Sequence, residues 1–127
     1  MDIGANTAAF AKEAKKREIE VTSVEISPGK DIPKNVPYIV ADAGNLPFAD
    51  ESFDIVVSHA CIQEIESRPG NTKKAIEEAK RVLKKGGEFH FGPEDSNERY
   101  AKYRIIEPSI EQRPSADNMV YYSLVKT

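Results

Sequence analysis

Short apolar runs alternate with amphipathic segments along most of the chain. The apolar runs are rich in β-branched and aromatic residues, which favour extended backbone, and they predict strands at 1–3, 21–25, 36–41, 53–58 and 88–91. The amphipathic segments predict helices at 7–17 and 71–85, because their apolar residues recur on one helical face. Gly86 or Gly87 is expected to end the second helix in a left-handed conformation. This alternation predicts an α/β fold, in which helices pack on a mostly parallel, twisted sheet.

The C-terminal part follows a different pattern. Residues 97–103 predict a short helix, and residues 104–110 and 119–125 predict two strands. The stretch between these strands is rich in turn-forming residues, including Pro114 and Asn118. The two strands are therefore expected to form an antiparallel C-terminal hairpin at the edge of the sheet.

Prolines interrupt the connection between the second and third strands. Pro28, Gly29, Pro33 and Pro37 lie in this stretch and exclude a crossover helix of normal length. We therefore expect a three-layer αβα arrangement with one thin face.

Composition limits the classes of protein to which the chain can belong. Its 127 residues suit a single domain, 1–127, with 39% hydrophobic and 31% charged residues. The net charge of −3 gives no general reason to bind nucleic acid, so we expect none. The single cysteine, Cys61, is compatible with a reducing cytoplasm, and we expect a cytoplasmic protein. No apolar run approaches the ~20 residues that span a bilayer, so no membrane association is expected.

Four motifs occur in a defined order. A glycine-containing turn at 2–11 follows the first strand, and the second strand ends in Glu25 and Ile26. The third strand leads into Asp42-Ala43-Gly44-Asn45-Leu46-Pro47-Phe48, which Ser52-Phe53-Asp54 soon follows. From residue 1 to about 92, this set resembles the class I S-adenosylmethionine (SAM)-dependent methyltransferases of the small-molecule type. The resemblance implies a Rossmann-like fold, SAM as cofactor, and methyl transfer to an unidentified, small-molecule acceptor.

Residue chemistry and the resemblance together give the candidate cofactor-binding residues. Ligands of doubly wound sheets bind beyond the carboxyl ends of the strands, where Gly4 permits close backbone approach and the Glu25 carboxylate can accept hydrogen bonds from ribose hydroxyls. The resemblance implies that Asp2 contacts the amino end of the methionine moiety. It also implies the remaining candidates. Asn6 lies in the first loop, three residues surround the adenine (Ile26, Asp42 and Ala43), and Ser58 lies near the methyl-transfer site. Asn6 and Ala8 stand where the family usually has glycine.

No catalytic residue is assigned. His59 could act as a general base, but methyl transfer mainly requires in-line positioning, so a base is optional for many acceptors. We interpret His59 and Cys61 as loop or core residues and His90 as structural. The sequence has no cluster of Cys, His or carboxylates at metal-ligand spacing, so no metal is expected.

Two other functions remain open. A catalytically degenerate, methyltransferase-like binding or regulatory module would explain Asn6, Ala8 and the atypical Gln63-Glu64. A nicotinamide-dependent oxidoreductase shares the acidic strand end but needs glycines that this loop lacks.

The resemblance also bears on assembly. The family has a helix and most of a strand before the first motif, which here begins at Asp2, so an N-terminally truncated methyltransferase is expected. Such a short central strand leaves backbone groups and apolar surface uncovered. We therefore expect the chain either to form a homodimer or to dock against a missing N-terminal segment, through the face near residues 1–5 and 27–37.

Overall fold

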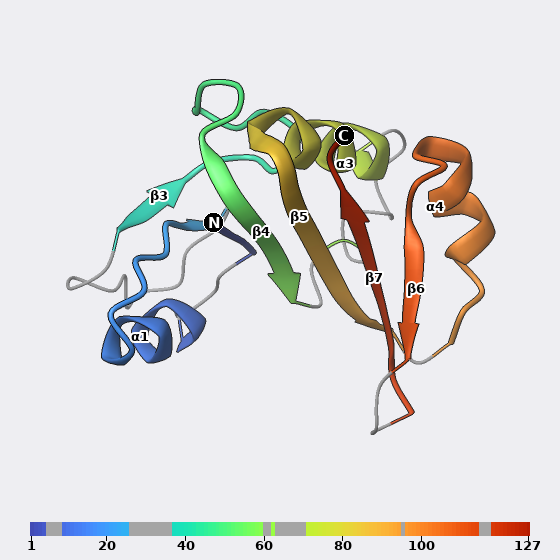
Figure 1. Ribbon diagram of the computed structural model, residues 1–127, viewed down its shortest axis with the longest axis horizontal. Helices are drawn as coiled ribbons and strands as arrows, with labels where there is room; N and C mark the ends of the chain where they lie inside the picture. The colour runs from blue at the N-terminus through green and yellow to red at the C-terminus, as the bar shows by residue number, and fades with distance from the viewer. Residues whose placement is uncertain (5–8, 26–36, 60–61, 63–70, 95, 115–117) are drawn as a thin grey trace.

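Seven strands form one sheet in the order β3-β2-β1-β4-β5-β7-β6 (Figure 1). The computed structural model describes residues 1–4, 9–25, 37–59, 62, 71–94, 96–114 and 118–127. The strands are β1 Asp2–Ile3, β2 Ser23–Glu25, β3 Tyr38–Val40, β4 Phe53–His59, β5 Leu83–Glu94, β6 Glu111–Pro114 and β7 Val120–Val125. The helices are α1 Ala9–Lys16, α3 Asn71–Val82 and α4 Tyr100–Ile106.

The direction of the strands confirms the predicted α/β fold. Strands β1 to β5 pair in parallel, whereas β7 runs antiparallel to both β5 and β6. The order of the strands reverses at β1, which lies between β2 and β4. In open α/β sheets, ligands bind at the carboxyl ends of the strands beside such a reversal. A ligand-binding site is therefore expected at the ends of β1 and β4.

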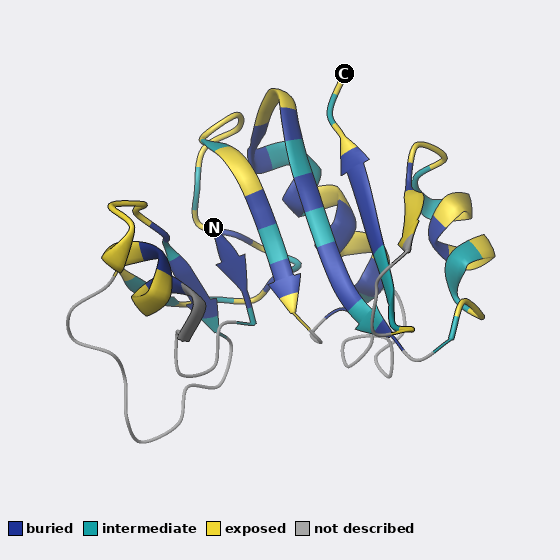
Figure 2. Ribbon diagram, turned by 60° about the horizontal axis from the view of Figure 1, so that its bottom comes forward, coloured by how far each residue is buried: buried dark blue, intermediate teal, exposed yellow. Residues whose placement is uncertain are grey.

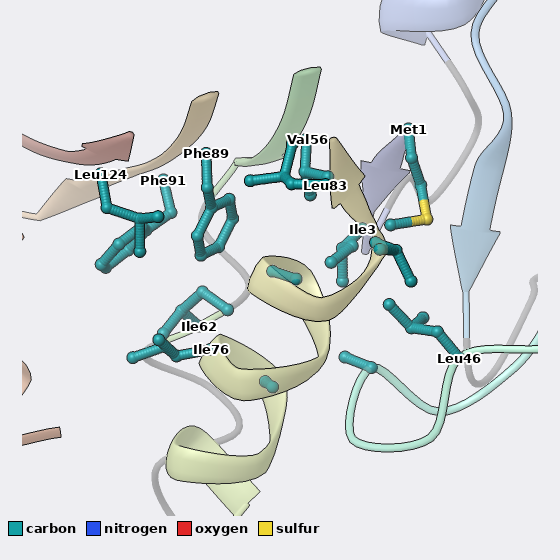
Figure 3. Packing of buried hydrophobic residues seen from close by; sticks show 14 of the residues in the cluster. Met1, Ile3, Leu46, Val56, Ile62, Ile76, Leu83, Phe89, Phe91 and Leu124 are labelled. Carbon is teal, nitrogen blue, oxygen red and sulfur yellow. The ribbon is translucent and has the colours of Figure 1, made fainter. Parts of the chain in front are cut away.

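Helix α3 covers one face of the central strands. Its Ala75, Ile76, Ala79 and Val82 are fully buried, because residues three and four apart share one side of a helix. Figure 3 shows the core that this face forms with the sheet, whose labelled side chains include Val56, Leu83, Phe89, Phe91 and Leu124. This packing fixes which residues of β4 and β5 point away from α3.

The opposite face of β4, β5 and β7 is open. Figure 2 shows α3 behind β4 and β5, and within the described ranges no helix lies over the front of these strands. Ile55 is 52% exposed and Val125 is 43% exposed on this side. Helix α1 instead packs near the β2 edge, where Ala11 and Ala14 contact Val21. One face is thin, as expected, although residues 27–36, on which that expectation rested, lie outside the described residues.

Several predicted boundaries differ from the structure. The predicted strand at 104–110 is wrong, because α4 extends to Ile106 and β6 begins only at Glu111. Tyr103 explains the difference, since on α4 its ring is fully buried against Phe91 and Tyr122. Helix α3 ends at Val82 rather than at residue 85, because the chain enters β5 at Leu83, and Gly86 has a positive φ of 82° within that strand.

Candidate functional site

A hollow of about 230 Å³ lies at the carboxyl ends of the central strands. It is lined by Asp2, Val57, Ser58, His59, His90, Phe91, Gly92 and Tyr121. The register explains this gathering, because Asp2 is the partner of Val57, and Val57 is the partner of His90. Side chains of directly paired residues lie on the same face of a sheet. The hollow therefore opens on the face that α3 does not cover.

A second hollow, of about 310 Å³, lies at the other end of the sheet. Its lining includes Val21, just before β2, and Pro37, just before β3. These positions are at the amino ends of the parallel strands, where doubly wound folds do not bind their ligands. The smaller hollow is thus the better candidate.

Asp2 is the most unusual residue of the site. It is only 4% exposed, and no group in the described part of the chain donates a hydrogen bond to its carboxylate. Burial raises the pKa of this carboxyl to about 6, the N-terminal charge opposes the shift, and the charge of Glu25 adds to it. A buried carboxylate with no hydrogen-bond donor among the described residues is costly, so Asp2 is suited to a cationic ligand group.

Gly4 and Glu25 lie at the same edge of the sheet. Gly4 has a φ of 74°, in the left-handed region that favours glycine, and its N–H donates to the Val24 carbonyl oxygen over 2.8 Å. Glu25 is half-buried and ends β2. The resulting arrangement has two carboxylates and a tight glycine turn at the ends of adjacent strands.

Asp42 and Ala43 follow β3 in a tight turn. The Asp42 side chain is exposed, and its Oδ1 accepts a 2.8 Å hydrogen bond from the Gly44 N–H. The Asp42 carbonyl oxygen accepts another, of 2.9 Å, from the Asn45 N–H. Ala43 is buried in the main core, so its methyl group anchors the turn. The turn therefore holds the Asp42 carboxylate through one of its two oxygens, just after β3.

The remaining predicted residues contribute differently. Ser58 lines the hollow, but strand alternation puts its side chain on the same face as the core residue Val56. The Ser58 hydroxyl is buried without a hydrogen-bond partner in the described structure. Asn6 and Ile26 lie outside the described residues, as does Cys61.

Sequence reasoning missed His90 and Tyr121. Both line the hollow together with His59, so the interpretation of His90 as structural does not account for its position. The His90 imidazole Nε2 lies 3.7 Å from Glu88 Oε1. Alternation with the buried Phe89 and Phe91 was a signal that His90 points away from the core, but only the strand register brings it to His59.

The described residues contain neither a candidate metal site nor a helix that could span a membrane. No group of three or more His, Cys, Asp or Glu residues there could hold a metal ion. None of the helices described is both long and apolar enough to cross a membrane.

Comparisons with known proteins agree with this geometry. The sequence model of a methyltransferase domain family matches residues 1–91. An uncharacterized protein of Methanocaldococcus jannaschii is 36% identical over 101 residues, which is 72% of this chain and 42% of that protein. A demethylmenaquinone methyltransferase of Renibacterium salmoninarum is 26% identical over 140 residues, covering 100% of this chain and 57% of that enzyme. The chain thus spans less than two thirds of the length of these curated relatives.

Solved structures share the fold. A crystal structure from Methanococcus maripaludis matches with a TM-score of 0.81 at 17% identity, covering 99% of this chain and 76% of that one. A TehB-like SAM-dependent methyltransferase from Corynebacterium glutamicum matches with a TM-score of 0.75 at 14% identity, covering 99% and 78%. The match to the family model over 91 of 127 residues favours the methyltransferase interpretation over the nicotinamide oxidoreductase. The chain belongs to the methyltransferase domain family, and it has the fold of SAM-dependent methyltransferases of known structure.

Proposed function

We propose that this chain binds SAM across the carboxyl ends of β1, β2 and β3 and transfers its methyl group to a small-molecule acceptor. The observation that carries the proposal is the buried Asp2 carboxylate, which lines the hollow and has no hydrogen-bond donor among the described residues. The ammonium group of the methionine moiety is the partner that this carboxylate lacks. Charge-assisted hydrogen bonds of this kind are among the stronger ones in proteins.

The other carboxylates suit the nucleoside part of the cofactor. Glu25, at the end of the next strand, can accept hydrogen bonds from the ribose hydroxyls. Asp42, held through one oxygen by Gly44, can accept one from the exocyclic amine of adenine. Asn6, Ile26, Ala43 and Ser58 stay in this proposal as the further cofactor contacts that the family resemblance implies.

The acceptor then enters over β4 and β5, because the cofactor occupies the ends of β1 to β3. His59, His90 and Tyr121 line this side of the hollow. When bound, SAM supplies an electrophilic methyl group, whose bond to the sulfonium sulfur breaks with both electrons staying on sulfur as the acceptor's lone pair attaches. A nitrogen of the His59 or His90 imidazole can take the proton that the acceptor gives up, because one ring nitrogen of a neutral imidazole is a hydrogen-bond acceptor.

Two considerations support a small acceptor. The hollow of about 230 Å³ is below the ~300–1,000 Å³ of typical ligand pockets and also takes the methionine end of SAM at Asp2, so it leaves room only for a small acceptor. One relative, the Renibacterium salmoninarum enzyme, is named for methylating demethylmenaquinone. We further propose that residues 1–127 act as one domain and that the protein is cytoplasmic.

Methyl transfer from radiolabelled SAM to a panel of small phenols, quinols and amines tests the proposal. Labelled product that falls at least about tenfold in His59→Ala or His90→Ala, with SAM affinity unchanged, would support these roles. SAM binding without any product would instead favour the degenerate binding module. The observation that supports this second function is that none of the described helices lies over this face of β4 and β5 (Figure 2).

We also propose that the chain self-associates. Ile55 and Val125 leave apolar surface on the open face, and apolar surface of this kind is commonly covered by a partner. We expect the contact near residues 1–5 and 27–37, and Ile55 on β4 and Val125 on β7 are further candidates for it. Sedimentation velocity at several concentrations should show a concentration-dependent dimer, whereas a monomer throughout would refute the self-association.

A further inference from the structure

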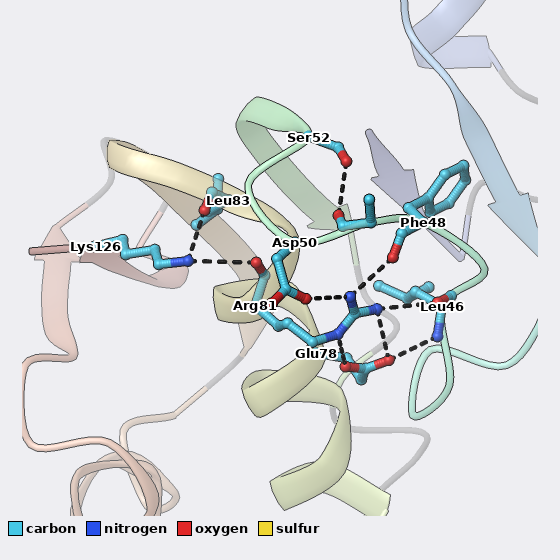
Figure 4. Close-up of polar contacts among 9 residues, drawn as sticks. Leu46, Phe48, Asp50, Ser52, Glu78, Arg81, Leu83 and Lys126 are labelled. Carbon is cyan, nitrogen blue, oxygen red and sulfur yellow. Dashed lines mark hydrogen bonds and ion pairs between the residues drawn. The ribbon is translucent and has the colours of Figure 1, made fainter.

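Arg81, near the end of α3, binds the main chain of the loop that joins β3 to β4 (Figure 4). Its Nη1 donates to the Phe48 carbonyl oxygen over 2.8 Å and to Asp50 Oδ1 over 2.8 Å. Its Nη2 donates to the Leu46 carbonyl oxygen over 3.0 Å. One guanidinium thus fixes the course of this loop across residues 46–50.

Glu78, one helical turn earlier, completes the contact. Its Oε1 accepts a 2.9 Å hydrogen bond from the Leu46 N–H and a 3.1 Å hydrogen bond from Arg81 Nη2. The hydrogen bond from Arg81 lowers the pKa of the Glu78 carboxyl, so Glu78 stays ionised. Both main-chain groups of Leu46 are therefore held by one ion pair on α3, which fixes the orientation of this residue's backbone.

A short, well-defined path connects Leu46 to Asp42. Asn45 and Gly44 both donate backbone hydrogen bonds to Asp42, one to its carbonyl and one to its carboxylate. Gly44 packs closely on α3, because a Cβ at this position would lie 3.2 Å from the Lys74 Cβ. A shift of Leu46 would therefore be transmitted through the turn to the Asp42 carboxylate.

We propose that Arg81 and Glu78 are positioning residues that set the preference of the SAM site for adenine. They hold the turn so that Asp42 meets the exocyclic amine, although neither contacts the cofactor in this arrangement. This inference rests on the proposed function, in which Asp42 recognises adenine. Sequence spacing gives no hint of it, because Arg81 and Leu46 are 35 residues apart.

The test compares two ligands that differ in the group Asp42 recognises. S-adenosylhomocysteine carries the exocyclic amine, and S-inosylhomocysteine carries a carbonyl oxygen there. We expect the wild-type chain to bind the first about tenfold more tightly or better, because the second turns an acceptor toward a carboxylate. In Arg81→Gln, this ratio should fall to about threefold or less, mainly through weaker binding of the adenine ligand.

Control variants separate positioning from general stability. Lys80→Gln removes a neighbouring ion pair, from Lys80 Nζ to Glu107 at 2.8 Å, and should leave the ratio unchanged. Arg81→Lys keeps the charge but not the forked geometry, so it should give an intermediate ratio. Glu78→Gln keeps an acceptor for the Leu46 N–H and is the milder variant if Arg81→Gln does not fold.

Each outcome decides the inference. If Arg81→Gln and Glu78→Gln weaken the binding of both ligands equally, the ratio of the two affinities stays unchanged. This result would overturn the positioning role and leave the proposed function standing. A wild-type chain that binds neither ligand would overturn both. A wild-type chain that binds both equally would show that no adenine preference exists for α3 to set.

Discussion

Asp2 lies in β1 and Glu25 ends the adjacent parallel strand β2, and the charge of Glu25 contributes to raising the pKa of Asp2. The larger contribution comes from the burial of Asp2, which brings its pKa to about 6. A polar, charged edge between two strands does not stabilise a ligand-free fold. In the proposed function, these carboxylates pair with the ammonium and ribose hydroxyl groups of the cofactor.

The affinity for S-adenosylhomocysteine should therefore depend on pH. Its ammonium group pairs with ionised Asp2, so affinity should rise about tenfold per pH unit below pH 6 and level off above it. Binding measured between pH 4.5 and 7.5 checks this expectation. The same series in Asp2→Asn isolates the residue, because the dependence attributed to Asp2 should be absent there. A wild-type curve parallel to that of the variant would contradict the assignment.

Stability of the ligand-free chain should change in the opposite direction. The folded pKa of Asp2 is raised above its ordinary value of 3.8, so the folded state holds the proton more tightly than the unfolded state does. The resulting stabilisation is complete below pH 3.8 and is lost as the pH rises through 6. The shift corresponds to about 3 kcal/mol at most. Urea unfolding at pH 4 and pH 8 measures the free energy of unfolding of wild type and of Asp2→Asn. Between these pH values, wild type should lose up to that amount of stability relative to the variant. A difference between the two proteins that is the same at both pH values would refute this expectation.

Tyr103 should matter for stability through its hydroxyl group. This group donates a 2.7 Å hydrogen bond to Glu94 Oε2, and both residues are buried. Tyr103→Phe leaves the buried carboxylate with a weaker set of donors and should lower the free energy of unfolding by about 1–3 kcal/mol. Tyr100→Phe is the matched control, since its hydroxyl reaches the Ile110 carbonyl oxygen only at 3.5 Å and its removal should cost less than about 0.5 kcal/mol. Equal losses in the two variants would show that the Glu94 contact is not the stabilising one.

The sequence was sufficient for the order and type of most elements in the parallel part of the sheet. Strand β4 and helix α3 have strong local patterns, and both were predicted within a few residues. The strand predicted at 104–110 was wrong, because residues 104–106 continue α4, which is held by the packing of Tyr100 and Tyr103 on Tyr122 and Phe91. Short aromatic segments of this kind are decided by tertiary packing rather than by local pattern.

The site divides in the same way. The places of Asp2, Gly4, Glu25 and Asp42 in or just after their strands could be predicted from the sequence pattern, whereas their contact with a cofactor stays a prediction. His90 could not be joined to His59, since that depends on a strand register that pairs Val57 with His90. That no group among the described residues donates a hydrogen bond to the Asp2 carboxylate likewise appears only once its neighbours are in place.

Isothermal titration with S-adenosylhomocysteine tests the central claim most directly. Wild type should bind it and should not bind NADH. Asp2→Asn and Glu25→Ala should each weaken binding by about 1–3 kcal/mol, because polar ligand groups lose their partners. Glu13→Gln, at an exposed position on α1, should bind as wild type does. Absence of binding in the folded wild-type chain, or unchanged affinity in both site variants, would contradict the assignment of SAM to this edge of the sheet.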